Sequence, residues 1–379
     1  MGCHADVCGY YPALIPTLVM ERMSPIESAY RRLRAIAAHQ LRVLKYEASI
    51  RGYAANTQSI VDRLRQTYQP LTRPLVLISQ AERSGGSMMA QLFDSHTELM
   101  AHPHELKIGY PDKGNWPRID VGKPIDDTFR DLFELDTIRM CEEGYAKGKH
   151  SVDRKNFLFI PQAQRQIFTA MLGSIGKPTP RDVLNAYFTS YFNAWVNMRG
   201  DIEAAKFVTG FTPRLTLNAE NFDRFWNDYP DGYLISIVRS PLSWFPSVVR
   251  QKAGNPLFDT RDKVTAYWNM SVEGTMREKE RKPERVIVIS FDDLVTNTEA
   301  TMRLIARRIG IRYEDTLTSP TFNGKPIEAN TSFGPMEPGS VSSAPVERGA
   351  LLSAEDRGQI EKTCMPLYER IMRDAVERI

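Results

Sequence analysis

The chain is poor in cysteine and lacks the patterns that cysteine-based sites need. Its four cysteines, Cys3, Cys8, Cys141 and Cys364, are scattered, and no Cys-x-x-Cys pair occurs. Such spacing favours neither a zinc site nor a disulfide framework. We therefore expect no bound metal and a reducing compartment, and we predict a cytoplasmic protein.

Long apolar runs are absent as well. Residues 1–20 become apolar toward their end, but Pro12 and Pro16 interrupt them and no basic leader precedes them. The stretch falls short of the ~20 apolar residues that a membrane-spanning helix needs. N-myristoylation is not expected either, because Asp6 stands where Ser or Thr is required after Gly2.

A strong charge of one sign is the third feature that the chain lacks. Lys and Arg number 49 and Asp and Glu 46, which gives a net charge of +3. This excess is too small to predict a nucleic-acid partner, so any basic site must be local. With 42% hydrophobic and 25% charged residues, the 379-residue chain is typical of a soluble protein with one large domain and an appendage.

Residues 1–70 are predicted to form an N-terminal helical extension. Ser24 and Glu27 can form a capping box, with Pro25 at the first helical position, and apolar residues at helical spacing follow. The segment is basic through Arg31, Arg32, Arg34, Arg42, Lys45 and Arg51. A solvated helix face is the simpler interpretation, and peripheral contact with a partner or an anionic membrane is the alternative. Residues 68–74 are interpreted as a linker.

Residues 71–379 are predicted to form an α/β domain with a central, mainly parallel sheet covered by helices. Apolar runs at 74–79, 232–239 and 285–291 each lead through a turn into a helical pattern. Short continuous apolar strands that alternate with helices are typical of such sheets. Thr296 and Glu299 are predicted to cap the last of these helices, and Gly310 to end it.

Residues 110–231 are mostly helical in pattern, with a strand at 206–211. Because substrates bind beyond the carboxyl ends of strands in open α/β folds, we interpret this range as an insertion that shapes an acceptor site. Its aromatic residues would suit a stacked sugar, and could equally belong to the core. They are Tyr110, Trp116, Tyr187, Tyr191 and Trp195.

The loop after the first apolar run has the outline of a phosphate-binding loop without its lysine. Gly85 and Gly86 let the backbone approach an anion, Ser84 and Ser87 can add hydroxyl donors, and Arg83 offers a permanently charged guanidinium. The nucleotide motif G-x-x-x-x-G-K-[ST] is not met. A plain glycine-containing turn between strand and helix is the alternative interpretation.

The stretch RSGGSMMAQLFDSH, at 83–96, resembles the 5′-phosphosulfate loop of sulfotransferases, in which K/R-S-G-T-T opens a helix and D-S/A-H closes it. Arg83 matches the basic residue and Ser87 the second threonine. Gly86 replaces the first threonine, which removes one hydroxyl. In GFTPR, at 210–214, Phe211 stands where a lysine is common in a similar family segment.

A second stretch, IVRSPLSWFPS at 237–247, is similar to the 3′-phosphate motif of the same family. Arg239 stands at a strand end, with Pro241 two and Ser247 eight residues later. About two helical turns separate Arg239 from Ser247, so both can face one phosphate. Near the C-terminus, Arg348 and Gly349 match the Arg-Gly of the loop that closes over the nucleotide.

The resemblance implies an α/β fold that binds 3′-phosphoadenosine 5′-phosphosulfate (PAPS) and transfers its sulfuryl group to a hydroxyl or amine, with no metal required. The implied donor-binding residues are Arg83, Ser84, Gly85, Gly86, Ser87, Met88, Arg239, Ser247, Arg348 and Gly349. Arg83 would also be catalytic, because it would stabilise charge on the bridging oxygen. A carbohydrate or glycolipid acceptor is expected from the breadth of the family.

A general base is expected in the segment AHPHEL, at 101–106, where His104 and Glu105 are both candidates. His102 and His104 would share a side of an extended chain, but no third ligand points to a metal clip. His96 is interpreted as a structural residue at a helix end. Two alternatives stay open beside a sulfotransferase: a kinase-like nucleotide-binding enzyme, and a non-catalytic binding protein on the same fold. The oligomeric state is not predicted.

Overall fold

The computed structural model describes residues 33–34, 37–38, 40–45, 58–109, 114–143, 157–328 and 336–379. Several sequence predictions therefore lie outside the described residues: the capping box of Ser24 and Glu27, the basic residues Arg31, Arg32 and Arg51, the cysteines Cys3 and Cys8, and Tyr110. In the described part of the extension, residues 40–45 and 58–67 are helical.

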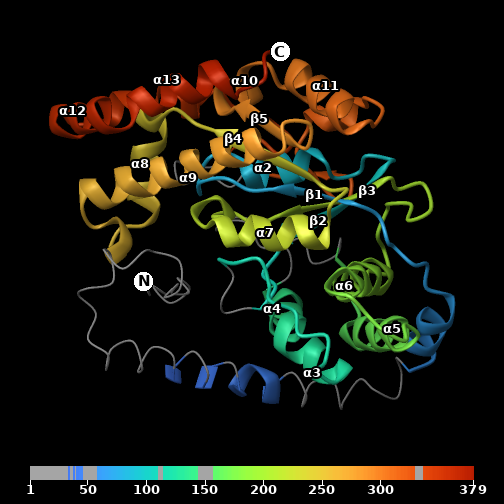
Figure 1. Cartoon of the computed structure of the whole chain (residues 1–379). Coiled ribbons are helices and arrows are strands. Elements are labelled where there is room, and N and C mark those ends of the chain that lie inside the picture. The colour runs from blue at the N-terminus through green and yellow to red at the C-terminus, as the bar shows by residue number, and fades with distance from the viewer. Residues whose placement is uncertain are drawn as a thin grey trace.

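A five-stranded parallel sheet forms the centre of the molecule (Figure 1). Its strands are β1 (Leu75–Ile78), β2 (Leu99–Glu105), β3 (Phe207–Phe211), β4 (Tyr233–Val238) and β5 (Val286–Ser290), in the order β2-β3-β1-β4-β5. Every neighbouring pair is parallel. The predicted parallel sheet is confirmed, and so are the strands expected near 74–79, 206–211, 232–239 and 285–291.

The sheet also revises two expectations. β3 lies between β2 and β1, so the range 110–231 is not purely an insertion, because it contributes an inner strand. β2 was not predicted as a strand. It is an edge strand that pairs only with β3, and an edge position tolerates its Pro103, which cannot donate to a ladder.

Helices surround this sheet. The α-helices are α2 (Gly86–Leu92), α3 (Ile125–Phe129), α4 (Leu135–Glu143), α5 (Pro161–Gly173), α6 (Pro180–Ala194), α7 (Ala219–Asp228), α8 (Pro241–Gln251), α9 (Arg261–Arg281), α10 (Phe291–Thr296), α11 (Thr298–Ile309), α12 (Ala354–Thr363) and α13 (Met365–Asp374). A π-helical turn (Arg130–Glu134) joins α3 to α4, and short 3₁₀ segments include η3 (Leu215–Leu217) and η6 (Ala344–Leu351). A small hairpin pairs β6 (Thr321–Phe322) with β7 (Lys325–Pro326).

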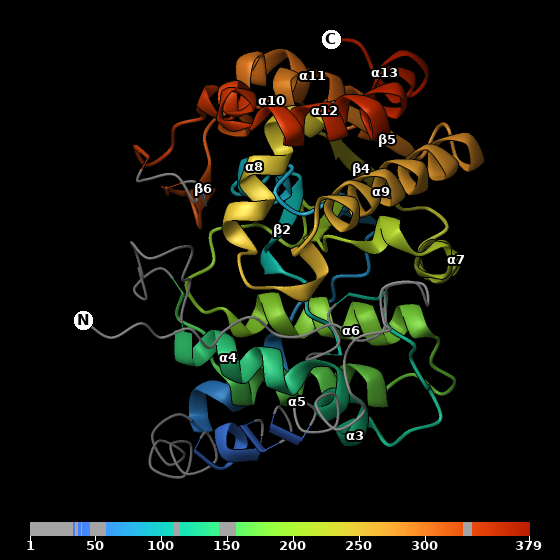
Figure 2. The ribbon, with the colours of Figure 1, turned by 90° about the vertical axis from the view of Figure 1, so that its left-hand side faces the viewer.

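The two faces of the sheet build two separate cores. Along β1, Leu75 and Leu77 join the core that includes α7 and α9, whereas Val76 and Ile78 join the core of α2, α10 and α11. This alternation follows from the two-residue period of a strand, and burial on both faces explains why the run is apolar throughout. Figures 1 and 2 show α10 and α11 on one side of the sheet, and α5 and α6 in an outer layer on the other side.

Of the two ends predicted for the helix that follows residues 285–291, the one at Gly310 is confirmed and the one at Thr296 is wrong. Gly310 ends α11 with φ 78°, and α8 begins at Pro241. Thr296 and Glu299 do not form a capping box. Ser290 Oγ instead accepts from the backbone N–H groups of Asp292 and Asp293 and starts α10 directly after β5. Thr296 is therefore the last residue of α10, and α11 begins at Thr298.

The predicted linker at 68–74 is docked rather than free. The N–H of Leu71, which is fully buried, donates to Thr189 Oγ1 of α6 at 2.8 Å. The preceding helical segment packs Val61 against Ala163 and Ile167 of α5. The extension therefore shares a core with α5 and α6. In the described residues, no helix is both long and apolar enough to cross a lipid bilayer.

Candidate functional site

The sheet order creates a switch point at the carboxyl ends of β1 and β4. The chain leaves β1 toward α2 on one face and leaves β4 toward α8 and α9 on the other. The N–H of Ser79 bonds the carbonyl of Ile235 at 3.0 Å, which joins the loop after β1 to β4. Ligands of open α/β sheets bind at such a point.

The loop between β1 and α2 has an unusual backbone. Arg83 has φ 65° and Gly85 has φ 93°. A left-handed conformation costs an arginine about 1–2 kcal/mol, so the surroundings must hold it. Arg239 Nη1 donates to the Arg83 carbonyl at 2.8 Å, and Trp244 Nε1 donates to the Glu82 carbonyl at 2.6 Å. The loop is thus fixed by residues from β4 and α8.

Gly86 begins α2 where a side chain would have no room. A Cβ at this position would overlap the side-chain amide of Gln80 and the ring of Phe211. The two departures from the sulfotransferase pattern, at residues 86 and 211, are therefore in contact. Phe211 and Gln80 occupy the space that a threonine at residue 86 would need.

Arg239 is the centre of the second half of the site. It is 3% exposed, and its guanidinium lies 4.4 Å from the centroid of the Phe291 ring. Nε donates to Ser243 Oγ at 3.0 Å, and Nη2 donates to the carbonyls of Ser243 and Pro345 at 2.8 Å each. Arg239 therefore connects β4, α8, the loop after β1 and the C-terminal segment η6.

Arg348 enters the site from η6. Its Nη1 donates to Ser247 Oγ of α8 at 3.0 Å, so the predicted Ser247 and Arg348 are in direct contact, while Arg239 reaches the same segment through the Pro345 carbonyl. Gly349 lies against Leu242 of α8. The structure thus brings the second set of predicted donor-binding residues to the loop that carries Arg83, Ser84, Gly85, Gly86, Ser87 and Met88.

The three arginines repel one another at this edge of the sheet. Burial, together with the charges of Arg348 and Arg83, lowers the pKa of Arg239 to about 9. Burial lowers the pKa of Arg348 to about 10, with Arg83 and Arg250 adding to the effect. Burial also lowers the pKa of Arg83. All three remain protonated at neutral pH, so an anion between them would relieve their repulsion.

Glu105 is connected to the loop after β1 through a buried network of ion pairs. Arg214 Nη2 lies 2.6 Å from Glu105 Oε1, and Arg214 Nη1 contacts Glu82, the residue before Arg83. Lys252 Nζ lies 2.7 Å from Glu82 Oε2. Burial opposes ionisation of Glu82, but the charges and hydrogen bonds of Arg214 and Lys252 lower its pKa to about 2.

His104 has different surroundings. Its ring packs edge-on against Phe157, with 5.6 Å between centroids, and lies 6.2 Å from the ring of His102. His102 is fully buried, and its two ring nitrogens contact the His104 carbonyl and the Tyr187 hydroxyl at 3.0 Å each. Burial lowers the pKa of His102 to about 4, so it is neutral at pH 7 and structural.

His96 also has structural contacts. Its Nε2 contacts the Arg312 carbonyl at 2.8 Å, and its Nδ1 accepts from the N–H of Glu98 at 3.1 Å. In the described ranges, no group of three His, Cys, Asp or Glu side chains could hold a metal ion.

A model of the sulfotransferase family matches residues 74–315 of the chain. The chain belongs to the sulfotransferase family. The matched range is more than half of the sequence and includes the loop after β1, the Arg239–Ser247 segment and the network around Arg214. A search of curated proteins finds no match.

Solved sulfotransferase structures resemble this chain at low sequence identity. The sulfotransferase domain of the Synechococcus PCC 7002 olefin synthase is 16% identical, with a TM-score of 0.44, and the match covers 81% of this chain and 97% of that one. A sulfotransferase from Alicyclobacillus acidocaldarius is 13% identical, with a TM-score of 0.40 and coverage of 80% and 97%. Mouse sulfotransferase SULT7A1, complexed with PAP, is 10% identical, with a TM-score of 0.34 and coverage of 84% and 91%.

The aromatic residues that could have stacked on a sugar belong to the hydrophobic core. Trp116, Tyr187, Tyr191 and Trp195 are at most 3% exposed. Tyr187, Tyr191 and Trp195 pack in one aromatic cluster, in which the rings of Tyr187 and Phe133 stack at 4.4 Å. Trp116 packs edge-on against Phe225, with 5.1 Å between centroids. Of the two interpretations of these four residues, the structure selects the core.

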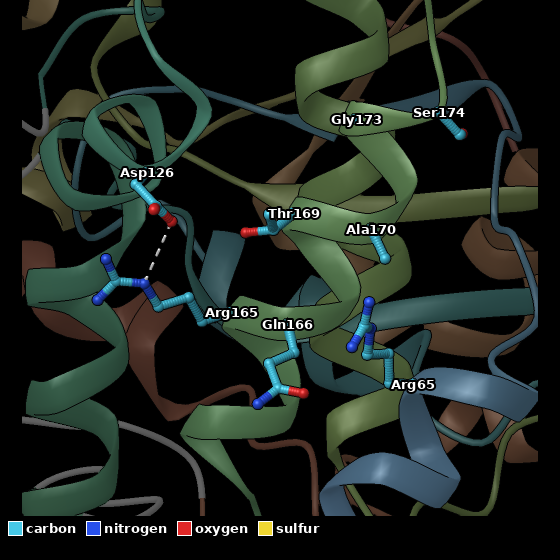
Figure 3. A pocket seen from close by; sticks show the side chains of 8 residues that line it. All are labelled: Arg65, Asp126, Arg165, Gln166, Thr169, Ala170, Gly173 and Ser174. Carbon is cyan, nitrogen blue, oxygen red and sulfur yellow. Dashed lines mark ion pairs between the residues drawn. The ribbon is translucent and has the colours of Figure 1, made fainter.

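A surface hollow of about 640 Å³ lies elsewhere, between the helical segment 58–67, α3 and α5 (Figure 3). Figure 3 shows Arg165 directed at Asp126, and their side chains form an ion pair at 3.6 Å. Both side chains are substantially exposed. The hollow belongs to the outer layer of helices and contains none of the residues of the loop or the arginine cluster.

Sequence reasoning missed two residues of the site, Gln80 and Arg214. Arg214 follows β3 in the segment that drew attention only through Phe211, and its position in a Thr-Pro-Arg run directly after a strand was the available signal. Gln80 carried no signal of its own, because its contact with Gly86 forms only when the loop is folded.

Proposed function

We propose that this sulfotransferase uses PAPS as donor and transfers its sulfuryl group to a hydroxyl or an amine. The observation that carries the proposal is the cluster of Arg83, Arg239 and Arg348 at the switch point of the sheet. PAPS carries a phosphosulfate and a 3′-phosphate, which offer the negative charge that such a cluster needs. Guanidinium groups suit these oxygens because they can donate in pairs.

In the proposed reaction, the acceptor atom attacks sulfur in line with the bridging oxygen. A bond forms between the acceptor and sulfur, the bond from sulfur to the bridging oxygen breaks, and 3′-phosphoadenosine 5′-phosphate (PAP) leaves. Arg83 and the backbone N–H groups of its loop stabilise the charge that develops on the leaving phosphate. The acceptor proton passes to a general base.

Glu105 is our choice for this base. It stands at the carboxyl end of β2, and Arg214 connects it to the residue that precedes Arg83. The ion pair with Arg214 fixes the position of this carboxylate, and a carboxylate oxygen can accept a proton. His104, in contrast, packs against Phe157 and His102.

The acceptor is specified here only as a hydroxyl or an amine. A carbohydrate or glycolipid stays a prediction from the breadth of the family, because the four buried aromatic residues do not support stacking on a sugar. Screening should therefore start with saccharides and continue with amines and simple alcohols.

Calorimetric titration with PAP tests the donor. We expect the unaltered protein to bind PAP and not ATP, and Arg348→Ala to bind PAP about tenfold to hundredfold more weakly, as expected for a lost charged hydrogen bond. Arg348 is preferable to Arg239, because Arg239 also holds three backbone carbonyls and its loss would weaken the fold. Arg373→Ala, which removes an exposed arginine of α13, is the matched control.

The result of this titration separates the alternatives. Binding of ATP in preference to PAP would support a kinase-like enzyme and refute the proposal. Binding of PAP without sulfuryl transfer to any acceptor class would support a non-catalytic binding protein.

The base is tested by Glu105→Gln, which keeps the shape of the side chain and a hydrogen-bonding oxygen for Arg214. We expect kcat to fall by about 10²–10⁴, as for loss of a general base, with the affinity for PAP unchanged. His104→Asn is the comparison and should retain most of the activity. The reverse result would assign the base to His104.

A further inference from the structure

Gln80 places a side-chain amide inside the loop after β1. The residue is 2% exposed, and its backbone carbonyl accepts from the N–H of Arg214 at 3.0 Å. Its side chain reaches across the loop to the start of α2, where its amide stands in the space that a side chain at Gly86 would occupy. The backbone bond to Arg214 holds one end of Gln80, and the contact with Gly86 limits where the amide at the other end can lie.

The amide is incompletely bonded by the chain itself. Gln80 Oε1 is buried and has no hydrogen-bond partner among the residues that the structure describes. Leaving a buried amide oxygen without a partner costs free energy, and native proteins leave few such groups. The donor end of the same amide, Nε2, lies at the start of α2, in the loop that also carries Arg83.

We propose that the amide of Gln80 donates an N–H to the phosphosulfate of the donor, in place of the hydroxyl that Gly86 lacks. This inference rests on the proposed function and names a further binding residue for it. An anion only accepts hydrogen bonds, and the amide nitrogen Nε2 is a donor. Nε2 is the atom of Gln80 that stands where a side chain at residue 86 would be, so the amide needs no rotation to take the place of the missing hydroxyl.

Gly86 and Gln80 thus act as a pair. Glycine at residue 86 makes room for the amide, and the amide supplies a donor from the end of β1 rather than from the first turn of α2. Phe211 closes the other side of this space. The donor for the anion is therefore positioned by the rigid sheet.

Two nucleotides separate this role from a structural one. PAP carries a 5′-phosphate and a 3′-phosphate, whereas adenosine 3′-monophosphate lacks the 5′-phosphate. Gln80→Leu keeps most of the side-chain volume and removes the amide. We expect it to bind PAP about tenfold to hundredfold more weakly and adenosine 3′-monophosphate within about twofold of the unaltered protein.

Gln164→Leu is the matched control, because Gln164 is a fully buried glutamine on α5, outside the loop. It should leave both affinities unchanged. Equal weakening of both nucleotides by Gln80→Leu would show a structural role, and no weakening of either would show no role; each overturns the inference. If the unaltered protein binds neither nucleotide, the proposed function itself is refuted, and the role of Gln80 with it.

Discussion

Glu82→Gln should lower the free energy of unfolding by about 3 kcal/mol at neutral pH. Glu82 is buried between Arg214 and Lys252, and despite burial these partners lower its pKa from 4.5 to about 2. A shift of that size corresponds to about 3 kcal/mol of preference for the ionised form in the folded state. Glutamine resembles the protonated carboxyl, so it forfeits this preference.

The pH dependence follows with a definite sign. Because the pKa is lower in the folded state, the stability from Glu82 is complete above pH 4.5 and is lost as the pH falls toward about 2. The difference between the unaltered protein and Glu82→Gln should therefore be constant at neutral pH and shrink below pH 4.5.

Urea unfolding followed by circular dichroism measures this difference at each pH. The matched control is Glu220→Gln, whose 61% exposed carboxylate pairs with arginines at the surface and should contribute less than about 1 kcal/mol. A loss below about 1 kcal/mol for Glu82→Gln at pH 7, or a difference that grows in acid, would refute the reasoning.

Three further outcomes are expected. Gly274→Ala should destabilise the protein by about 2–3 kcal/mol, because the added Cβ would overlap the Thr216 carbonyl. Gly358→Ala, which has open space around it, should instead stabilise the protein through α12 by about 0.5–1 kcal/mol, and urea unfolding compares the two variants. Burial lowers the pKa of His102 to about 4, so between pH 6.5 and about 4 the unfolded chain takes up a proton that the folded protein does not, and the folded state loses stability as the pH falls. His102→Gln should remove this part of the pH dependence, and unfolding at several pH values measures it. The affinity for PAP should fall when salt rises from about 0.05 to about 0.5 M, and a salt-independent affinity in calorimetry would contradict an arginine-based site.

The parallel sheet and the loop were predictable because their signals are local. An apolar run such as 74–79 indicates a strand that is buried on both faces, and the glycines of 83–87 indicate a tight turn of the backbone. β2 was missed because two histidines and a proline obscure its apolar pattern. Only its position at the edge of the sheet makes this composition acceptable in a strand.

The residues of the proposed donor site were selected from motif spacing, but the contacts among them could not be. Gly86 and Phe211 were interpreted as separate departures from a family pattern, and their contact depends on the order of the strands. Gln80 and Arg214 are functional candidates only because distant segments meet around the loop. The capping box at Thr296 failed for a local reason, since Ser290 offered an earlier cap.

Arg239 contacts a segment that lies beyond the range matched by the family model. The family match ends at residue 315, yet the carbonyl of Pro345 accepts from Arg239 and the Arg348 guanidinium bonds Ser247. A chain shortened to residues 74–315 would keep all five strands and the loop, but would lose one of the three arginines and a carbonyl that fixes another. The proposed donor site is therefore longer than the range that the family model matches, and a domain cut at residue 315 would lack part of it.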